Sequence, residues 1–199
     1  MKFILASASP RRREILSHLG LDFTVVCADA DETSDERDGE KLVELLSKRK
    51  ASAVYDALSA RGEMTPDTLI IASDTVVVSP DGDILGKPHD EQEAAQMLRS
   101  LSDRTHRVIS GIAVLTPARC VTAHEVTEVV FSPLSEALIA RYVASGEPMD
   151  KAGAYGIQDT AALWIKGIRG DYFNVVGLPV YRLEQVLKQH FCLSLWGNT

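Results

Sequence analysis

Three consecutive arginines stand at the predicted start of a helix, in segment 7–13 with the sequence SASPRRR. Ser9 is suited to cap this helix and Pro10 to be its first residue, where the fixed φ and missing N–H of proline are tolerated. A helix N-terminus carries partial positive charge, so guanidinium groups there repel it unless an anion binds. With free backbone N–H groups and the hydroxyl of Ser7, they predict a phosphate site; a solvated basic turn is the alternative. Successive helical residues are rotated by about 100°, so one or two of the arginines would face the ligand.

Asp74 interrupts the apolar strand predicted for residues 69–78. Burying an unpaired carboxylate is costly, so it needs a cation, a hydrogen-bond network or a proton. An aspartate at a strand end can cap the turn that follows, but residues 75–78, with the sequence TVVV, continue this strand. We therefore expect Asp74 to bind a metal or to accept a proton.

Two lysines are candidates for binding an oxyanion. Lys50 lies inside the apolar stripe of a long predicted helix. A lysine stem often passes along such a stripe to reach water, which is one explanation. The other is that Lys50 points to an oxyanion and supplies a positive charge. Lys87 lies in a short loop bounded by glycine and proline, and it follows the Asp74 strand closely enough to return to the same site.

An acidic stretch at residues 29–36 contains Asp29, Asp31 and Glu32. Composition alone assigns this stretch to a solvated loop. Together with Asp74, these residues are also candidate Mg²⁺ ligands, because hard cations bind carboxylate oxygens and substrate phosphates together.

Residues 150–158, with the sequence DKAGAYGIQ, combine two glycines with the amide of Gln158. Glycine permits a close approach of the backbone to a ligand, and an amide both donates and accepts hydrogen bonds, as reading a base edge requires. A tight turn between two elements is the alternative; it explains the glycines but not the whole string.

Strands and helices alternate along the chain and must position these residues. Strands are predicted at residues 3–6, 23–26, 69–78, 107–115, about 121–131 and 163–165. Helices are predicted at residues 10–19, from 39 onward, at about 90–101 with apolar positions 94, 97, 98 and 101, at 135–144, and from 179 to about 190. Hairpin-length links in the middle indicate an α/β protein with a mixed sheet. No internal repeat divides the chain, so residues 1–199 are expected to form one domain with two lobes.

Composition excludes several classes of protein. The chain has 199 residues, is 45% hydrophobic and 25% charged, and can bury a full core. Its net charge of −7 argues against a general nucleic-acid or membrane-surface binder. No apolar run approaches the ~20 residues that cross a bilayer, and the N-terminal run is too short for a signal peptide. Three separate cysteines predict reduced thiols in the cytoplasm, with Cys27 and Cys120 as small buried side chains.

Taken in order, these segments resemble the motifs of the Maf family of nucleoside triphosphate pyrophosphatases. Segment 7–13 is similar to the opening S-x-S-P-R-R of that family, residues 31–32 to its D-E pair, residues 50–51 to the conserved lysine of its long helix, and residues 73–77 to its A-D-T-V-V strand. LGKP at 85–88, GEPMDKAGAYGIQ at 146–158 and GDYFNVVGLP at 170–179 complete the match. The second of these is similar to the branch that acts on dTTP and UTP. Ser73, Asp159 and the pair Lys48-Arg49 depart from the usual alanine, glycine and R-E.

The resemblance implies a role for each matching residue. Asp74 would be the catalytic carboxylate that accepts a proton, with Glu32 as the alternative base. Asp74 and Glu32 would hold a divalent metal, Mg²⁺ or Mn²⁺. Base selection would fall to Arg11, Thr75 and Gln158, and the handling of phosphates, metal or water to Ser7, Arg12, Glu32, Lys50 and Lys87. The implied fold is Maf/ITPase-like, an elongated mixed sheet with flanking helices and two lobes around a central cleft.

The implied activity is hydrolysis of dTTP and UTP, or of modified pyrimidine nucleotides, to the nucleoside monophosphate and pyrophosphate, which would cleanse the nucleotide pool. One alternative is a pyrophosphatase for another non-standard nucleotide. The other is a nucleotide-binding regulator of cell division. The expected partner is a pyrimidine nucleoside triphosphate, with neither nucleic acid nor membrane. Members of the family are often dimeric, so a homodimer is one assembly that the resemblance implies.

Overall fold

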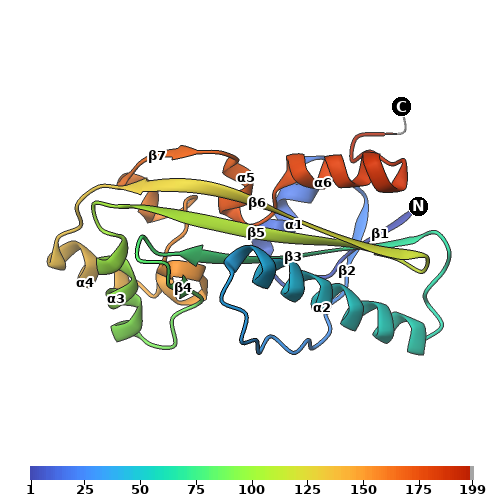
Figure 1. Ribbon diagram of the computed structural model, residues 1–199, viewed down its shortest axis with the longest axis horizontal. Helices are drawn as coiled ribbons and strands as arrows, with labels where there is room; N and C mark the ends of the chain where they lie inside the picture. The colour runs from blue at the N-terminus through green and yellow to red at the C-terminus, as the bar shows by residue number, and fades with distance from the viewer. Residues whose placement is uncertain (198–199) are drawn as a thin grey trace. The chain divides into compact units, whose positions relative to one another are not determined.

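The computed structural model describes residues 1–197, in which helices and strands alternate along the chain (Figure 1). Seven strands form one sheet in the order β2-β1-β3-β5-β6-β7, with β4 paired to β3. The strands are β1 (Lys2–Leu5), β2 (Phe23–Val25), β3 (Thr68–Val78), β4 (Ile84–Leu85), β5 (Thr105–Thr116), β6 (Arg119–Phe131) and β7 (Ile165–Arg169). The helices are α1 (Pro10–His18), α2 (Gly39–Ala60), α3 (Glu91–Leu101), α4 (Glu136–Ala144), α5 (Tyr172–Val176) and α6 (Val180–Val186).

The sheet is mixed, as the sequence predicts. Strand β1 pairs in parallel with both β2 and β3, whereas β3 with β4 and β6 with β7 are antiparallel pairs. Parallel pairs need crossover connections, and helices α1 and α2 provide them. The predicted α/β class with a mixed sheet and flanking helices is therefore confirmed.

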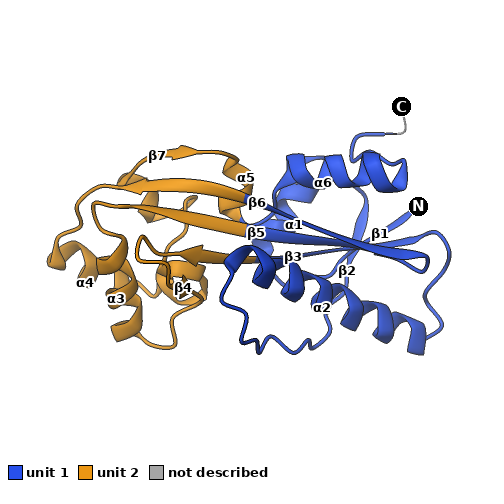
Figure 2. Ribbon diagram, viewed as in Figure 1, with its two compact units in different colours: residues 1–74, 110–125, 177–199 blue, residues 75–109, 126–176 orange. Residues whose placement is uncertain are grey.

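The chain divides into two compact units (Figure 2). The first contains residues 1–74, 110–125 and the described residues from 177 onward; the second contains residues 75–109 and 126–176. Strands β3, β5 and β6 contribute residues to both units. A single domain with two lobes around a central cleft stays a prediction.

In the first unit, α2 packs on the sheet through one apolar face. Ala51, Val54 and Leu58 join Ile4 and Ile70 of β1 and β3 in one buried cluster. Each methylene buried in this way contributes about 0.8 kcal/mol. The helix begins at a fixed position because its N-cap, Asp38, accepts hydrogen bonds from the two amides that follow Gly39.

Gly111 of β5 lets the backbone of α2 approach the sheet closely. A Cβ atom at this position would lie 2.4 Å from both the carbonyl carbon and the carbonyl oxygen of Val43, and 2.8 Å from the amide nitrogen of Glu44. No side chain other than hydrogen fits such a gap. Glycine here fixes how closely the first turns of α2 lie against β5.

In the second unit, α3 and α4 cover a separate core. The four apolar positions predicted for α3, Ala94, Met97, Leu98 and Leu101, are all buried. Rings at its centre meet edge to face, with centroids 4.8 Å apart for His106 and Phe131 and for Phe131 and Tyr155. These rings come from β5, β6 and the segment 152–155, so their contacts tie that segment to the sheet.

Two predictions about the fold differ from the structure. The strand predicted at residues 163–165 is wrong: Thr160–Leu163 is a 3-10 helix, and the strand begins only at Ile165. Cys27 is exposed and Cys120 half-buried, so neither thiol is fully buried as expected. The helix predicted from residue 179 to about 190 is confirmed, and its last part, Leu187–Phe191, is π-helical.

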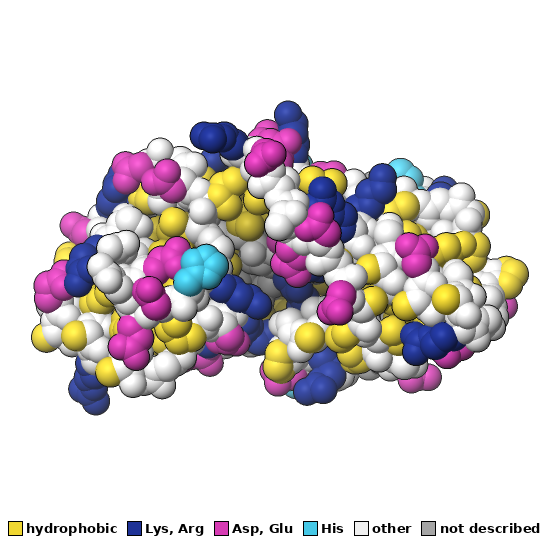
Figure 3. Space-filling view, turned by 90° about the horizontal axis from the view of Figure 1, so that it is seen from below, with side chains coloured by type: hydrophobic (Ala, Val, Ile, Leu, Met, Phe, Trp, Pro, Cys, Tyr) yellow, Lys and Arg dark blue, Asp and Glu magenta, His cyan; other side chains and the backbone are white. Residues whose placement is uncertain are grey.

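The surface carries charges of both signs. On the face that Figure 3 shows, Lys and Arg side chains are interspersed with Asp and Glu and form no continuous basic surface. Among the helices of residues 1–197, none combines the length and apolarity needed to span a membrane. The absence of a nucleic-acid partner and the cytoplasmic location stay predictions.

Candidate active site

The turn between β1 and α1 brings Ser7 and Arg12 together. Ser9 occupies the N-cap position of α1, as predicted, but its hydroxyl makes no capping bond. The hydroxyl of Ser7 instead accepts from the amide of Ser9 at 3.2 Å and from Nη1 of Arg12 at 3.2 Å. Ser7 is buried, Arg12 half-buried and Arg13 exposed. Arg11 is half-buried on the same turn. Which of the arginines would face a ligand stays a prediction.

The carbonyl oxygen of Gly177 holds both Arg12 and Ser73. Arg12 donates to it from Nε at 2.8 Å, and the buried hydroxyl of Ser73 donates to it at 2.9 Å. Sequence reasoning missed this contact because a backbone carbonyl has no side chain to reveal it. Ser73, noted only as a departure from alanine, gains a structural role through its hydroxyl.

Lys50 links the two predicted metal-binding carboxylates. Its Nζ donates a hydrogen bond to Oδ1 of Asp74 and lies 3.2 Å from Oε1 of Glu32. Asp74 is 7% exposed, so this ammonium supplies the counter-charge that a buried carboxylate needs. Lys50 therefore points to two carboxylates of the protein rather than along the stripe to water. That it also supplies its charge to an oxyanion of a ligand stays a prediction.

Arg49 fixes the loop that carries Glu32. Its Nη1 donates to the carbonyl oxygens of Asp31 and Thr33 at 3.1 and 2.6 Å. The carboxylate of Asp31 accepts from the amide and the hydroxyl of Thr33, and these hydrogen bonds lower the pKa of Asp31. Asp31 thus closes a turn, and Glu32 is the acidic residue of this stretch that meets Lys50. The departure at Arg49 from the family pattern is the only signal in the sequence for this contact.

Electrostatics connect Arg12 to the same group of residues. Burial lowers the pKa of Arg12; Asp74 opposes this shift, neighbouring Arg11 adds to it, and Glu32 opposes it. A guanidinium keeps its proton throughout the range in which proteins are studied. Arg12 is therefore a permanent cation close to both carboxylates.

The second unit carries the other three predicted site residues. Thr75 is half-buried on β3, while Lys87 and Gln158 are exposed in loops. The amide of Gly153 donates to the carbonyl oxygen of Gly86 at 3.0 Å, which joins the loop of Lys87 to the segment that leads to Gln158. At φ 68°, Gly153 also packs so tightly that a Cβ would lie 2.7 Å from a methyl group of Val77. The roles of Thr75, Lys87 and Gln158 in binding stay predictions.

Asp74 and Glu32 fit a divalent cation. Mg²⁺ commonly takes one or two carboxylates and completes its coordination with water and substrate phosphates. Two carboxylates that share one ammonium are donors of this kind. No group of three or more His, Cys, Asp or Glu side chains within residues 1–197 is arranged to hold a metal, so the phosphates and water would supply the remaining ligands.

These observations define a class of protein. The half-buried cations Arg12 and Lys50, two carboxylates and the start of α1 lie beside a mixed α/β sheet, as in a protein that binds and handles phosphate groups. The chain belongs to the Maf family, since the family model described as "Maf-like protein" matches residues 2–190.

Curated relatives cover nearly the whole chain. A protein of Alkaliphilus metalliredigens named dTTP/UTP pyrophosphatase is 46% identical over 197 residues, 98% of each chain. Proteins of the same name are 49% identical in Symbiobacterium thermophilum, covering 94% of this chain and 93% of that one, and 48% in a Geobacillus species, covering 94% and 97%. The solved structure of the Staphylococcus aureus Ham1 protein is similar over 66% of this chain and 72% of that one, with 14% identity and a TM-score of 0.47, too weak a likeness to support an argument.

Proposed function

We propose that this chain hydrolyses dTTP and UTP between the α- and β-phosphates, giving the nucleoside monophosphate and pyrophosphate. The observation that carries the proposal is the similarity to proteins named dTTP/UTP pyrophosphatase, which are 46–49% identical to this chain along nearly its whole length. The charged group formed by Asp74, Lys50 and Glu32 supports it. Modified pyrimidine triphosphates are the related substrates to test.

Asp74 is the proposed general base. It accepts a proton from the water that attacks the α-phosphorus, as the P–O bond to the pyrophosphate breaks. Its position on a buried strand supports this role, because a strand holds a side chain more rigidly than a loop does. Glu32, whose side chain is 60% exposed on a loop, is better suited to bind metal and water.

Lys50 and Arg12 carry the positive charge that the reaction needs. A triphosphate becomes more negative at the leaving pyrophosphate as hydrolysis proceeds, and fixed cations stabilise that charge. Lys50 also holds Asp74 in place through its hydrogen bond. A divalent cation bound by Asp74 and Glu32 would polarise the phosphoryl oxygens and lower the pKa of bound water.

Selection of the pyrimidine base is assigned to Gln158, Thr75 and Arg11 by the family motifs that they match. A glutamine amide can pair with the carbonyl and N–H groups of thymine and uracil, which lie side by side on one edge. Lys87 is assigned to the phosphates. These four assignments rest on the family resemblance.

The test measures products and rates for dTTP, UTP, CTP and modified pyrimidine triphosphates with Mg²⁺ or Mn²⁺. We expect monophosphate and pyrophosphate from dTTP and UTP, and a fall in kcat of about 10²- to 10⁴-fold in Asp74→Asn. Asp22→Asn, at an exposed position, is the matched control. Release of inorganic phosphate instead of pyrophosphate, or a wild-type rate in Asp74→Asn, would overturn the proposal. Nucleotide binding without turnover would favour the regulatory alternative.

A further inference from the structure

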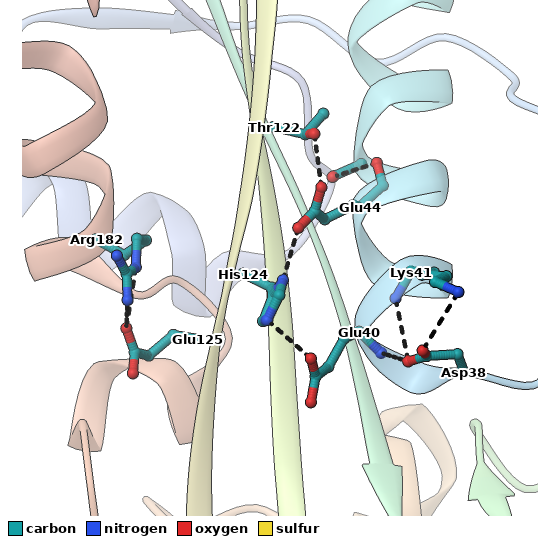
Figure 4. Close-up of polar contacts among 9 residues, drawn as sticks. Asp38, Glu40, Lys41, Glu44, Thr122, His124, Glu125 and Arg182 are labelled. Atoms are coloured by element: carbon teal, nitrogen blue, oxygen red, sulfur yellow. Dashed lines mark hydrogen bonds and ion pairs between the residues drawn. The ribbon is translucent and has the colours of Figure 1, made fainter. Parts of the chain in front are cut away.

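His124 on β6 lies between two glutamates of α2 (Figure 4). Its Nδ1 is 2.6 Å from Oε1 of Glu44, and its Nε2 is 3.1 Å from Oε2 of Glu40. The two glutamates are one helical turn apart and therefore lie on the same face of α2. Thr122, two residues before His124 on the same face of β6, donates from its hydroxyl to the other oxygen of Glu44 at 2.7 Å.

Both histidine contacts are hydrogen bonds only when the imidazole is doubly protonated. A neutral imidazole has one N–H donor, and its other nitrogen presents a lone pair that repels a carboxylate. The charged groups facing His124 are Glu40 and Glu44 of α2. Neighbouring Thr122 is neutral, and residues 110–116 of β5 carry no charged side chain. The imidazolium form therefore joins α2 to β6, and the neutral form weakens one of the two contacts.

This contact occurs where the backbone of α2 comes close to β5. Gly111 brings β5 against the backbone of Val43 and Glu44, and His124 holds the side chain of Glu44. Lys50 follows Glu44 by six residues, about 9 Å along the helix axis. A helix transmits a small shift at one turn to the next, so the anchoring of the first turns determines where Nζ of Lys50 lies.

The next residue of β6 anchors a different helix. Successive side chains of a strand point to opposite faces, and Glu125 accepts a hydrogen bond from Nε of Arg182 on α6 at 3.2 Å and lies 3.1 Å from its Nη2 (Figure 4). Helix α6 follows Gly177, whose carbonyl oxygen binds Arg12 and Ser73. One short stretch of β6 thus holds both helical segments that lead to the candidate active site in this unit.

We propose that His124 is a positioning residue: its imidazolium, bound to Glu40 and Glu44, fixes the first turns of α2 against β6 and so holds Lys50 on Asp74 and Glu32. This inference rests on the proposed function for its activity readout. Its structural readout, the protection of α2 amides from hydrogen exchange, is independent of any activity.

The test compares His124→Gln, which is neutral at every pH, with His124→Arg, which stays charged at every pH. His190→Gln, at an exposed position, is the control. Pyrophosphate release from dTTP and amide exchange over residues 40–50 are measured at pH 6 for each variant and for wild type.

We expect kcat of His124→Gln to be about tenfold below wild type at pH 6, with KM changed less. His124→Arg, which keeps the positive charge, should match wild type under the same conditions. Amides of α2 should exchange faster in His124→Gln at pH 6 and be unchanged in His190→Gln.

Equal kcat and equal α2 exchange in His124→Gln and wild type at pH 6 would overturn the inference. A folded His124→Arg variant with a kcat as low as that of His124→Gln would also overturn the inference, because a positive charge at this position would then not join α2 to β6. If wild type itself releases no pyrophosphate, the proposed function fails, and the exchange of α2 amides still decides the positioning role.

Discussion

The ammonium of Lys50 on α2 donates a hydrogen bond to the carboxylate of Asp74 on β3, a residue 24 positions away in the chain. The two side chains are only 19% and 11% exposed, so each supplies a counter-charge to the other where little water reaches them. Lys50 is also 3.2 Å from Glu32, which makes it the centre of the charged group. A substitution of Lys50 should therefore affect both folding and catalysis.

Replacing Lys50 by Gln removes the cation that donates a hydrogen bond to the buried Asp74. We expect the free energy of unfolding to fall by about 2 kcal/mol, the order of cost for an unsatisfied buried polar group. The value of kcat/KM for dTTP should fall about 100-fold, because a charge that stabilises the transition state is lost. Urea unfolding and pyrophosphate release measure the two effects. Lys48→Gln, on an exposed face of the same helix, should change neither; equal effects from both variants would show that Lys50 has no special role.

Chelation of divalent cations should abolish pyrophosphate release, and added Mg²⁺ or Mn²⁺ should restore it. Glu32→Gln should raise the metal concentration that gives half-maximal activity by about tenfold, because one of two carboxylate donors is lost. Titration of activity with Mg²⁺ checks this prediction, with exposed Asp35→Asn as the control. Full activity after exhaustive chelation would remove the metal from the proposed mechanism.

Gly111→Ala should destabilise the first unit. The added Cβ would lie 2.4 Å from backbone atoms of Val43, and backbone cannot move aside as a flexible side chain can. We expect a loss of about 3 kcal/mol, at the upper end of the range for overpacking. Gly167→Ala on β7 meets nothing within 4 Å and should be almost neutral. Thermal unfolding of both variants tests the contrast; similar melting temperatures would show that α2 does not lie as close to β5 as described.

His106 should make the stability of the protein depend on pH. Burial lowers its pKa to about 4, whereas the ordinary value is 6.5. Between these values the unfolded chain binds a proton that the folded chain does not, so the contribution is complete above about pH 6.5 and is lost as the pH falls toward 4. At 1.36 kcal/mol for each pKa unit the loss reaches about 3 kcal/mol. Urea unfolding at pH 7, 6 and 5 measures it.

His106→Phe keeps an aromatic ring against Phe131 and Tyr155 but cannot titrate. It removes the hydrogen bond between Nε2 of His106 and the hydroxyl of Tyr155, so some stability should be lost at pH 7. The decline from pH 7 to pH 5 should become shallower than in wild type. An unchanged decline would assign the pH dependence to other groups.

The sequence predicts an element well where its periodicity is long. The four apolar positions predicted for α3 are all buried. This prediction succeeds because eleven residues are enough to show a helical period clearly. Three apolar residues at 163–165 cannot distinguish a strand from a short helix, and Leu163 is in fact 83% exposed in a 3-10 turn. The sequence predicts a buried Cys27, but this residue is exposed. The burial of a single small residue depends on its neighbours in space, which a local pattern does not show.

For the site, the sequence identifies charged residues in apolar segments but not their partners. Asp74 and Lys50 stand out because each interrupts an apolar pattern. That they bind each other depends on how α2 packs on the sheet, which Gly111 and His124 help to set. The carbonyl of Gly177 could not be found by a search for reactive side chains, and Arg49 was visible only as a departure from the family pattern.

The carbonyl of Gly177 has a consequence for synthesis of the protein in the cell. Arg12 and Ser73 emerge from the ribosome long before Gly177, and the first unit takes its residues from three separate stretches of the chain. Chains usually begin to fold from the N-terminus as they are made. Here the contact of Arg12, a residue proposed to bind phosphate, must wait for the last part of the chain, so an incompletely translated product would lack the contact that orients Arg12.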